Sequence, residues 1–421
     1  MTFDLCIIGA GAAGCVAAIT AGRNGKSVLL LEAKDKIASK LYRTGNGKCN
    51  LTNLRMGEDC FFSDAEEGVL QRLSPMDAAF LMRFFEDLGV VLYARDGYVY
   101  PRTEQASTIV QALQTELSRL SVTIKTGVTV GSIKREHPSA GPFLITDKEG
   151  ETYTSEMVLI ATGGLAGEKD APGDLGYAMA RSCGHSVYPL YPVLVPLYTS
   201  PEEISLAFGV RCHAQLTLLV DGKEAASESG QLQIIRNGLS GIPVFQISHL
   251  AGKALQEGKE VRILVDFLPD VQAEVLAERI ETSVKEAGEE TLGMILNGLL
   301  HDKLIRMILA LYDLQPEMKV RNFLEKREDA EAILHDVMLS MKSLSVPVTH
   351  TGDFTEAQVT AGGVPLKEVT KEGASLLQEG LFLAGEILNV DGICGGYNLT
   401  HAFLSGIQAG NACSLYPDGR S

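Results

Sequence analysis

The sequence has no block of basic residues, and 53 aspartates and glutamates outnumber 37 lysines and arginines, giving a formal net charge of −16. Proteins that bind nucleic acid or an anionic membrane surface carry basic clusters, so the sequence predicts neither partner. No run of about eighteen uninterrupted apolar residues is present, which argues against a membrane-spanning helix. What remains is a globular chain of 421 residues, long enough for two or three domains.

The eight cysteines form no C-x-x-C pair and no spacing typical of a zinc site, so no metal site is predicted. Scattered cysteines in a large chain indicate reduced thiols and a cytoplasmic protein. The apolar N-terminal stretch lacks a basic region, contains Asp4 and is interrupted by glycines. We therefore interpret it as folded core rather than as a signal peptide.

The sequence opens with a predicted β-α-β unit. Residues 5–8 form a short apolar run, typical of a buried parallel strand, and the motif GAGAAG follows at once. Gly9 permits a tight turn, Gly11 lets the backbone approach a pyrophosphate, and Gly14 allows close packing of helix on strand. This order of features is the context in which a G-x-G-x-x-G motif binds a dinucleotide.

A helix is predicted to about Asn24, with Gly25 as its C-cap, and residues 27–31 form a second strand that ends at Glu32. Glu32 can accept hydrogen bonds from the ribose of an adenosine. An NAD-dependent dehydrogenase opens in the same way, so this unit does not identify the dinucleotide. A glycine-rich turn in an unrelated α/β protein is the alternative.

A second junction of strand and helix lies near the end of the chain, in LFLAGEILNVDGICGGYNL at 381–399. An apolar strand ends at Gly385-Glu386, and an apolar helix is predicted to begin near Asn398. The start of a helix stabilises negative charge, such as a reduced flavin carries. A carboxylate or carbonyl near Glu386 can hold ribityl hydroxyls. A tight turn before a core helix is the alternative.

Two further strands complete the predicted nucleotide fold. The strand at 157–160 ends in small residues at 161–164, and the strand at 122–125 leads to Val128, a candidate edge for an adenine. Contacts from both ends of the chain suit an extended cofactor such as FAD.

The motifs GAGAAG, GNGKCNLTN, IATGG, VTAGGV and LAGEILNVDGICGGYNL together resemble a bacterial flavoprotein family, that of aminoacetone oxidases and BaiN-type NAD(P)/FAD-dependent oxidoreductases. It is a branch of the two-dinucleotide-binding-domain flavoproteins. The resemblance implies an α/β fold with a Rossmann-like FAD-binding domain, interrupted by an inserted β-barrel-like domain that carries a helical subdomain. FAD is the implied cofactor, and NAD(P)H is a possible transient electron donor.

The expected domain boundaries follow from composition and from this resemblance. The FAD-binding domain is expected at 1–190 and 348–421, the inserted β-rich domain at 191–270, the helical subdomain at 271–335, and the return through the insert at 336–347. Strands are predicted at 216–220, 232–235 and 261–265, with a hairpin turn at Asp221-Gly222. Apolar residues at helical spacing predict helices over 292–300 and 304–311.

By resemblance, Thr44–Asn53 is a flavin-side loop whose small residues let backbone amides approach a flat ring. Lys48 would face the negative charge of the flavin or a phosphate, with a solvated loop charge as the alternative. Arg236 and Ile242 replace a histidine and a proline of the family pattern, so substrate contacts do not carry over there. The predicted cofactor-binding residues are Gly9, Gly11, Ala12, Ala13, Gly14, Glu32, Ala33, Lys40, Gly45, Asn46, Gly47, Lys48, Cys49, Asn50, Val128, Ala161, Thr162, Gly163, Gly385, Glu386, Gly396, Tyr397, Asn398 and Leu399.

The favoured function is an FAD-dependent oxidoreductase that transfers a hydride between a small organic substrate and the flavin. Relatives point either to reduction of conjugated C=C bonds or to oxidation of amines by O₂. No second G-x-G-x-x-G follows a strand, so a dedicated NAD(P)H domain is not predicted. An NAD-dependent dehydrogenase and a non-catalytic redox sensor are the alternatives. Cys49, Cys394 and His401 are weak catalytic candidates, each with a packing role as its alternative, and the oligomeric state is not set by the sequence.

Overall fold

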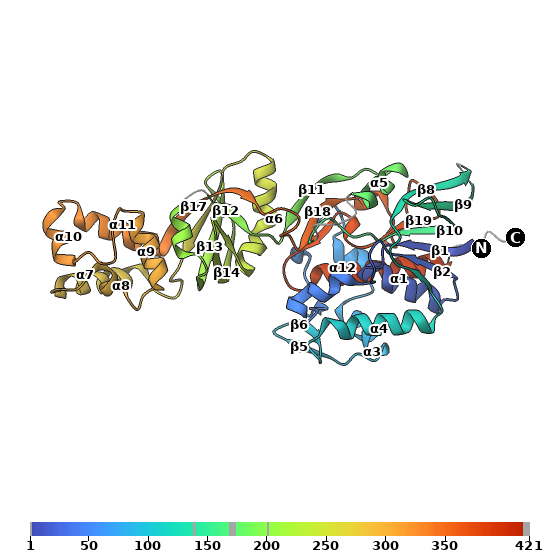
Figure 1. The fold of residues 1–421 in the computed structure, drawn as a ribbon, viewed down its shortest axis with the longest axis horizontal. Helices are drawn as coiled ribbons and strands as arrows, with labels where there is room; N and C mark the ends of the chain where they lie inside the picture. Colours follow the sequence, from blue (N-terminus) through green and yellow to red (C-terminus); the bar gives the residue numbers. More distant parts are fainter. Residues whose placement is uncertain (1, 138–139, 168–173, 200–201, 416–421) are drawn as a thin grey trace. The chain divides into compact units, whose positions relative to one another are not determined.

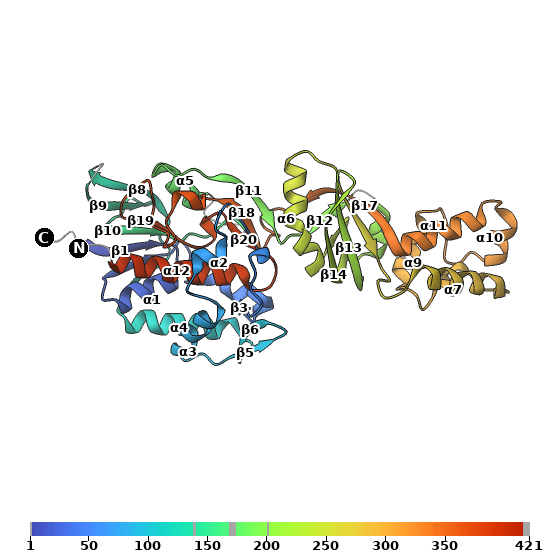
Figure 2. The same cartoon turned by 180° about the vertical axis from the view of Figure 1, so that it is seen from behind.

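The computed structural model of the chain describes residues 2–137, 140–167, 174–199 and 202–415 (Figure 1, and from behind in Figure 2). The chain forms two compact units, one of Met1–Tyr191 with Val359–Ser421 and one of Pro192–Gln358. The chain passes from the first unit into the second between residues 191 and 192, one residue after the expected boundary at 190/191. The chain returns to the first unit between residues 358 and 359 rather than between 347 and 348. The return is later than expected because β17 (Leu344–Thr351) still pairs with barrel strands β12 and β16.

A seven-stranded sheet in the order β7-β2-β1-β10-β9-β8, with β19 also paired to β10, forms the centre of the first unit. Its parallel strands are β1 (Thr2–Ile8), β2 (Val28–Leu31), β7 (Thr123–Lys125), β10 (Thr152–Ile160) and β19 (Leu381–Leu383). The antiparallel hairpin of β8 (Val130–His137) and β9 (Ala140–Asp147) extends one edge. The apolar runs in β1 and β2 are buried on both faces, which confirms the strands expected there.

The first and last helices of this unit, α1 (Ala12–Arg23) and α12 (Tyr397–Leu415), lie side by side in both views (Figures 1 and 2). Gly406 and Gly410 of α12 face the backbone of α1. A β-carbon at Gly406 would lie 2.4 Å from the carbonyl oxygen of Ala13, and one at Gly410 would lie 2.6 Å from that of Ala17. The two helices therefore pack backbone against backbone.

Smaller elements surround this core. They are 3₁₀ helix η1 (Ser39–Gly47), β3 (Thr52–Asn53), β4 (Phe61–Ser63), α2 (Val69–Leu73), α3 (Ala78–Asp87), β5 (Leu92–Arg95), β6 (Tyr98–Pro101), α4 (Ala106–Arg119), α5 (Leu175–Ser182), β11 (Tyr188–Val193), β18 (Val359–Gly363), 3₁₀ helix η5 (Gly385–Ile387) and β20 (Val390–Gly392). Strands β3, β6 and β5 form a separate small sheet.

The second unit contains a closed antiparallel barrel, which the family resemblance implied. Its strands, in barrel order, are β12 (Leu197–Thr199), β15 (Gly238–Ser240), β14 (Lys223–Ile235), β13 (Arg211–Val220), β16 (Val261–Asp266) and β17. Asp221 and Gly222 join β13 to β14 with φ of 49° and 75°, the positive values of the predicted Asp-Gly turn. Helix α6 (Ile242–Gln256) was not predicted and contacts β14 and β13.

A helical part lies between barrel strands β16 and β17, with α7 (Ala273–Glu286), α8 (Leu292–Leu296), α9 (Asp302–Ala310), α10 (Val320–Lys326) and α11 (Ala330–Ser343). It extends to Ser343, beyond the expected end at 335. The helix predicted over 292–300 is wrong at its C-terminal end, because the chain turns at Gly298, where φ is 87°. Among the described helices, none is both long and apolar enough to cross a membrane.

Substitution of Gly406 by valine should destabilise the first unit, because the new side chain must separate α12 from α1. Overpacking of this kind costs about 1–3 kcal/mol, which lowers the midpoint of thermal unfolding by roughly 2–10 °C. Circular dichroism melts would measure the shift. Leu415→Ala, an exposed change on the same helix, is the control, and equal midpoints for the two variants would contradict the close packing of α12 on α1.

Candidate active site

The glycine turn between β1 and α1 has the geometry of a pyrophosphate site. Gly9 has φ of 102°, and a β-carbon there would lie 2.5 Å from the carbonyl oxygen of Ala161. A β-carbon at Gly14 would lie 1.9 Å from the carbonyl oxygen of Gly9, whereas nothing lies within 4 Å of the corresponding position at Gly11. Two glycines are thus needed for packing, and the third leaves open space at the start of α1 for a phosphate group.

Glu32 ties this turn to the end of β2. One carboxylate oxygen accepts a hydrogen bond from the amide of Ala10 at 2.8 Å, and the other accepts one from the amide of Lys34 at 3.0 Å. A carboxylate has about four acceptor positions, so two remain for the hydroxyls of a ribose. The amide of Val128 donates to the main-chain carbonyl of Glu32 at 2.9 Å, so the predicted adenine contact lies beside the backbone of the predicted ribose contact.

Lys40 and Glu386, which are far apart in the sequence, form a second part of the site. The Lys40 ammonium lies 2.9 Å from Oε2 of Glu386, and Oε1 of Glu386 accepts a hydrogen bond from the amide of Thr360 at 2.9 Å. A β-carbon at Gly164 would lie 2.8 Å from the same Oε1. The small residues after β10 therefore make room for a carboxylate from the C-terminal segment, and the sequence-predicted Lys40, Gly163 and Glu386 come together.

The junction before α12 contacts the flavin-side loop directly. The side-chain amide of Asn53 donates to the carbonyl of Gly395 at 3.0 Å, and Oγ1 of Thr52 lies 2.7 Å from Oγ1 of Thr400. Asn398 closes its own turn with two hydrogen bonds to the backbone of Gly392. Two motifs that lie at opposite ends of the sequence thus form one structure.

Asn50 has a buried side-chain oxygen without a hydrogen-bond partner in the described part of the chain. This oxygen lies 3.1 Å from the position that a β-carbon on Gly396 would take. An unpaired buried amide oxygen is costly unless a ligand or water pairs it. Together with the open space at Gly11 and the free positions on Glu32, it shows that the residues present fit FAD.

Lys48 does not join this group. Its ammonium pairs with Glu104 at 2.6 Å, and this hydrogen bond raises the pKa of Lys48. Tyr397 donates its hydroxyl to the carbonyl of Arg55 at 2.9 Å, and its ring packs edge-on against Phe61. The hydroxyl of Tyr397 is thus engaged within the protein.

The three candidate catalytic side chains are uncharged at neutral pH, with Cys49 and His401 buried and Cys394 half-buried. Burial raises the pKa of the Cys49 thiol to about 11 and that of the Cys394 thiol to about 12. Burial, assisted by the positive charge of Arg72, lowers the pKa of His401 to about 4. These environments favour packing roles over thiolate or imidazolium chemistry. In the described ranges, no group of three or more His, Cys, Asp or Glu side chains is arranged to hold a metal ion.

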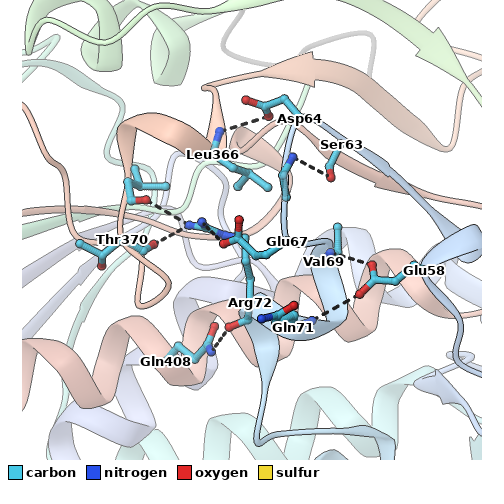
Figure 3. A network of polar contacts seen from close by, with 12 residues as sticks. Glu58, Ser63, Asp64, Glu67, Val69, Gln71, Arg72, Leu366, Thr370 and Gln408 are labelled. Atoms are coloured by element: carbon cyan, nitrogen blue, oxygen red, sulfur yellow. Dashed lines mark hydrogen bonds and ion pairs between the residues drawn. The ribbon is translucent and has the colours of Figure 1, made fainter.

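Figure 3 shows a polar network with Arg72 at its centre. The Arg72 guanidinium donates to the carbonyls of Val369 and Thr370 and pairs with Glu67, and Gln408 donates to the Arg72 carbonyl. Glu58 caps the first turn of α2. The network joins α2 to α12 and to the turn at 369–370. The Arg72 guanidinium is held by these contacts, and its positive charge is part of the environment that keeps His401 neutral.

Sequence reasoning missed Thr360 and Glu104. Thr360 uses its hydroxyl to accept hydrogen bonds from the amides of Leu165 and Ala166 and its own amide to hold Glu386. The motif VTAGGV contained the signal for Thr360, because a small polar residue precedes glycines at a strand end. Nothing in the sequence marks Glu104 as the partner of Lys48.

Glu32→Ala should weaken FAD binding about 10- to 100-fold, because hydrogen bonds to a charged group contribute about 1.5–3 kcal/mol. The change also frees the Ala10 amide of the glycine turn. Equilibrium titration of the apoprotein with FAD would measure the loss. Glu151→Ala removes an exposed carboxylate that pairs with Lys125 and is the control. Equal affinity for FAD in the Glu32 variant and the wild type would show that Glu32 does not contribute to FAD binding.

His401 should make the protein less stable in acid. Its pKa is about 4 in the folded chain against 6.5 for an ordinary histidine, so the unfolded chain binds a proton first as the pH falls. The contribution of His401 is complete above pH 6.5 and falls by about 3 kcal/mol down to pH 4. Chemical unfolding of the wild type and of His401→Phe across this range would test it, since only the wild type should show this loss. A constant difference between them would contradict a lowered pKa.

Comparison with known proteins identifies the family of this chain. The family model described as the HI0933-like protein Rossmann domain matches residues 3–412. A 3-dehydro-bile acid delta(4,6)-reductase of Clostridium scindens is 38% identical over 98% of this chain and 99% of its own length. Ribosomal RNA dihydrouridine synthases of Escherichia coli and Haemophilus influenzae are 28% and 27% identical, over 96% and 97% of both chains.

Solved structures agree on the fold. A 3-ketosteroid delta1-dehydrogenase from Sterolibacterium denitrificans matches with a TM-score of 0.51 and 13% identity, covering 99% of this chain and 100% of the other. A flavocytochrome c3 fumarate reductase matches with a TM-score of 0.50 and 16% identity, over 98% and 78%. With the family match and the relative at 38% identity, these observations lead to one conclusion. The chain belongs to the HI0933-like family of Rossmann-domain flavoproteins and is an FAD-dependent oxidoreductase.

Proposed function

We propose that this protein reduces a carbon–carbon double bond conjugated to a carbonyl group in a small cyclic substrate, with NADH or NADPH as the electron donor. The observation that carries the proposal is the 38% identity to a 3-dehydro-bile acid delta(4,6)-reductase over nearly the whole of both chains. Local substitutions such as Arg236 and Ile242 leave the exact substrate open. The reaction class is less sensitive to them, because it depends on the cofactor.

FAD supplies the hydride chemistry when it is bound, and the protein supplies orientation and electrostatics. The start of α1 with its open Gly11 would hold the pyrophosphate, and Glu32 would hold the ribose. The Lys40–Glu386 pair adds a neutralised polar contact where β10 and the C-terminal segment meet. Asn50 offers its unpaired oxygen at the junction with Gly396.

Reduction of a uracil ring in RNA is a second candidate, favoured by the two ribosomal RNA dihydrouridine synthases that match along nearly the whole chain. A uracil also holds a double bond conjugated to a carbonyl. The net charge of −16 disfavours an RNA partner, because phosphate contacts require basic side chains. Oxidation of an amine by O₂ is the further alternative.

Anaerobic stopped-flow spectroscopy of the FAD-loaded protein would test the proposal. NADH or NADPH should bleach the flavin absorbance within seconds, and a cyclic enone should restore it without oxygen. Free FAD at the same concentration, mixed with the same donor, is the control. Bleaching by small amines, with no response to either nicotinamide, would replace the reductase proposal with an oxidase.

A further inference from the structure

The small sheet of β3, β6 and β5 presents a face of aromatic side chains. In its hairpin, Tyr93 pairs with Tyr100 and Arg95 pairs with Tyr98, so these four side chains share one face. Val99, which points to the opposite face, is fully buried. The sheet is thus anchored on one side and leaves tyrosines on the other.

This tyrosine face forms a hollow of about 200 Å³. The residues that line it are Lys48, Tyr93, Arg95, Asp96, Tyr98, Tyr100 and Glu104. Sites that enclose a whole drug-sized ligand are typically about 300–1,000 Å³. The hollow therefore suits one ring or one end of a larger substrate, and its tyrosine faces suit a flat ring.

The hollow adjoins both segments assigned to the flavin. The ring of Tyr100 lies 3.6 Å from the position that a β-carbon on Gly45 would take. Asn53, the strand partner of Tyr98, donates to the carbonyl of Gly395. Lys48 belongs to the flavin-side loop and points into the hollow. A ligand seated here is thus held by the elements that also contact the cofactor.

The charges that line the hollow are already paired. Lys48 lies 2.6 Å from Glu104, and Arg95 lies 3.7 Å from Asp96. Arg102 lies over the Tyr93 ring, 5.8 Å from its centroid, and does not line the hollow. Balanced charge disfavours a phosphate or another strongly anionic group and favours a neutral ligand.

Two hydrogen-bond donors are available for such a ligand. The hydroxyl of Tyr93 donates to Glu104, but the hydroxyls of Tyr98 and Tyr100 make no hydrogen bond to any residue within the described ranges. Phenol hydroxyls are good donors to a carbonyl oxygen. A carbonyl that accepts a hydrogen bond also draws electrons from a conjugated double bond, which eases addition of a hydride.

We propose that this hollow binds the carbonyl-bearing flat ring of the substrate, with Tyr98 and Tyr100 as the donors to its carbonyl oxygen. The inference rests on the proposed function and adds to it the place and the chemistry of substrate recognition. The same ring chemistry has two sources, a small cyclic enone and a uracil in RNA, and the experiment below separates them.

The FAD-loaded protein would be titrated anaerobically, without an electron donor, with 4-androstene-3,17-dione, a neutral steroid that carries a conjugated ketone. Perturbation of the flavin absorbance reports binding. Loss of two hydrogen bonds in the variant Tyr98→Phe/Tyr100→Phe should raise the Kd about tenfold. The rings remain, so packing is retained, and Tyr188→Phe, which removes a tyrosine hydroxyl from β11, should leave the Kd unchanged. A parallel titration with decauridylate at low salt tests the RNA source.

A selective loss of steroid binding in the double variant supports the proposal with a small enone. A selective loss of decauridylate binding supports the proposal with RNA as the source. Equal Kd values in the double variant and the wild type overturn it, as does a wild type that binds neither probe. FAD content is measured in every sample. A wild type that fails to bind FAD would contradict the proposed function. If the FAD-loaded wild type and the FAD-loaded double variant bind a probe equally well, only the assignment of the substrate to this hollow is contradicted.

Discussion

Backbone-to-backbone contact between α1 and α12 is the constraint on which the candidate site depends. Gly406 and Gly410 let α12 approach the carbonyls of Ala13 and Ala17, closer than any side chain would permit. Because α1 starts at the glycine turn and α12 starts at the GGYNL junction, this contact sets the separation of the two cofactor contacts. The precision of the site thus comes from helix packing in the core rather than from its loops.

The charged and titratable groups of the site are suited to binding a cofactor rather than to taking part in the reaction themselves. Lys40 is neutralised by Glu386, the thiols of Cys49 and Cys394 stay protonated, and His401 stays neutral. None of these groups offers a charged nucleophile or a strong acid near pH 7. Such a site leaves electron transfer to the cofactor, and substrate selection then falls to shape and to neutral hydrogen-bond donors.

Periodicity and turn chemistry were enough to predict the β1-α1-β2 unit, barrel strands β13, β14 and β16 and the Asp221-Gly222 hairpin, because each depends on contiguous residues. The barrel closure and the family came from resemblance. Contacts over long sequence separations were not predictable from the chain. Lys48 pairs with Glu104 rather than facing the flavin or a phosphate as expected, and no local sequence pattern predicts that ion pair. The helix predicted over 292–300 stops early because Gly298 turns the chain, a conformation that apolar spacing does not report.

The division of the chain has a consequence for its synthesis on the ribosome. The inserted unit, Pro192–Gln358, is continuous, so all of its residues have emerged before α12 is translated. The first unit lacks parallel strand β19 and helix α12, which covers α1, until residues 381–415 have been made. Apolar surface of the N-terminal half therefore stays uncovered while the insert is made, and the cofactor contacts near α12 cannot form before α12 is translated.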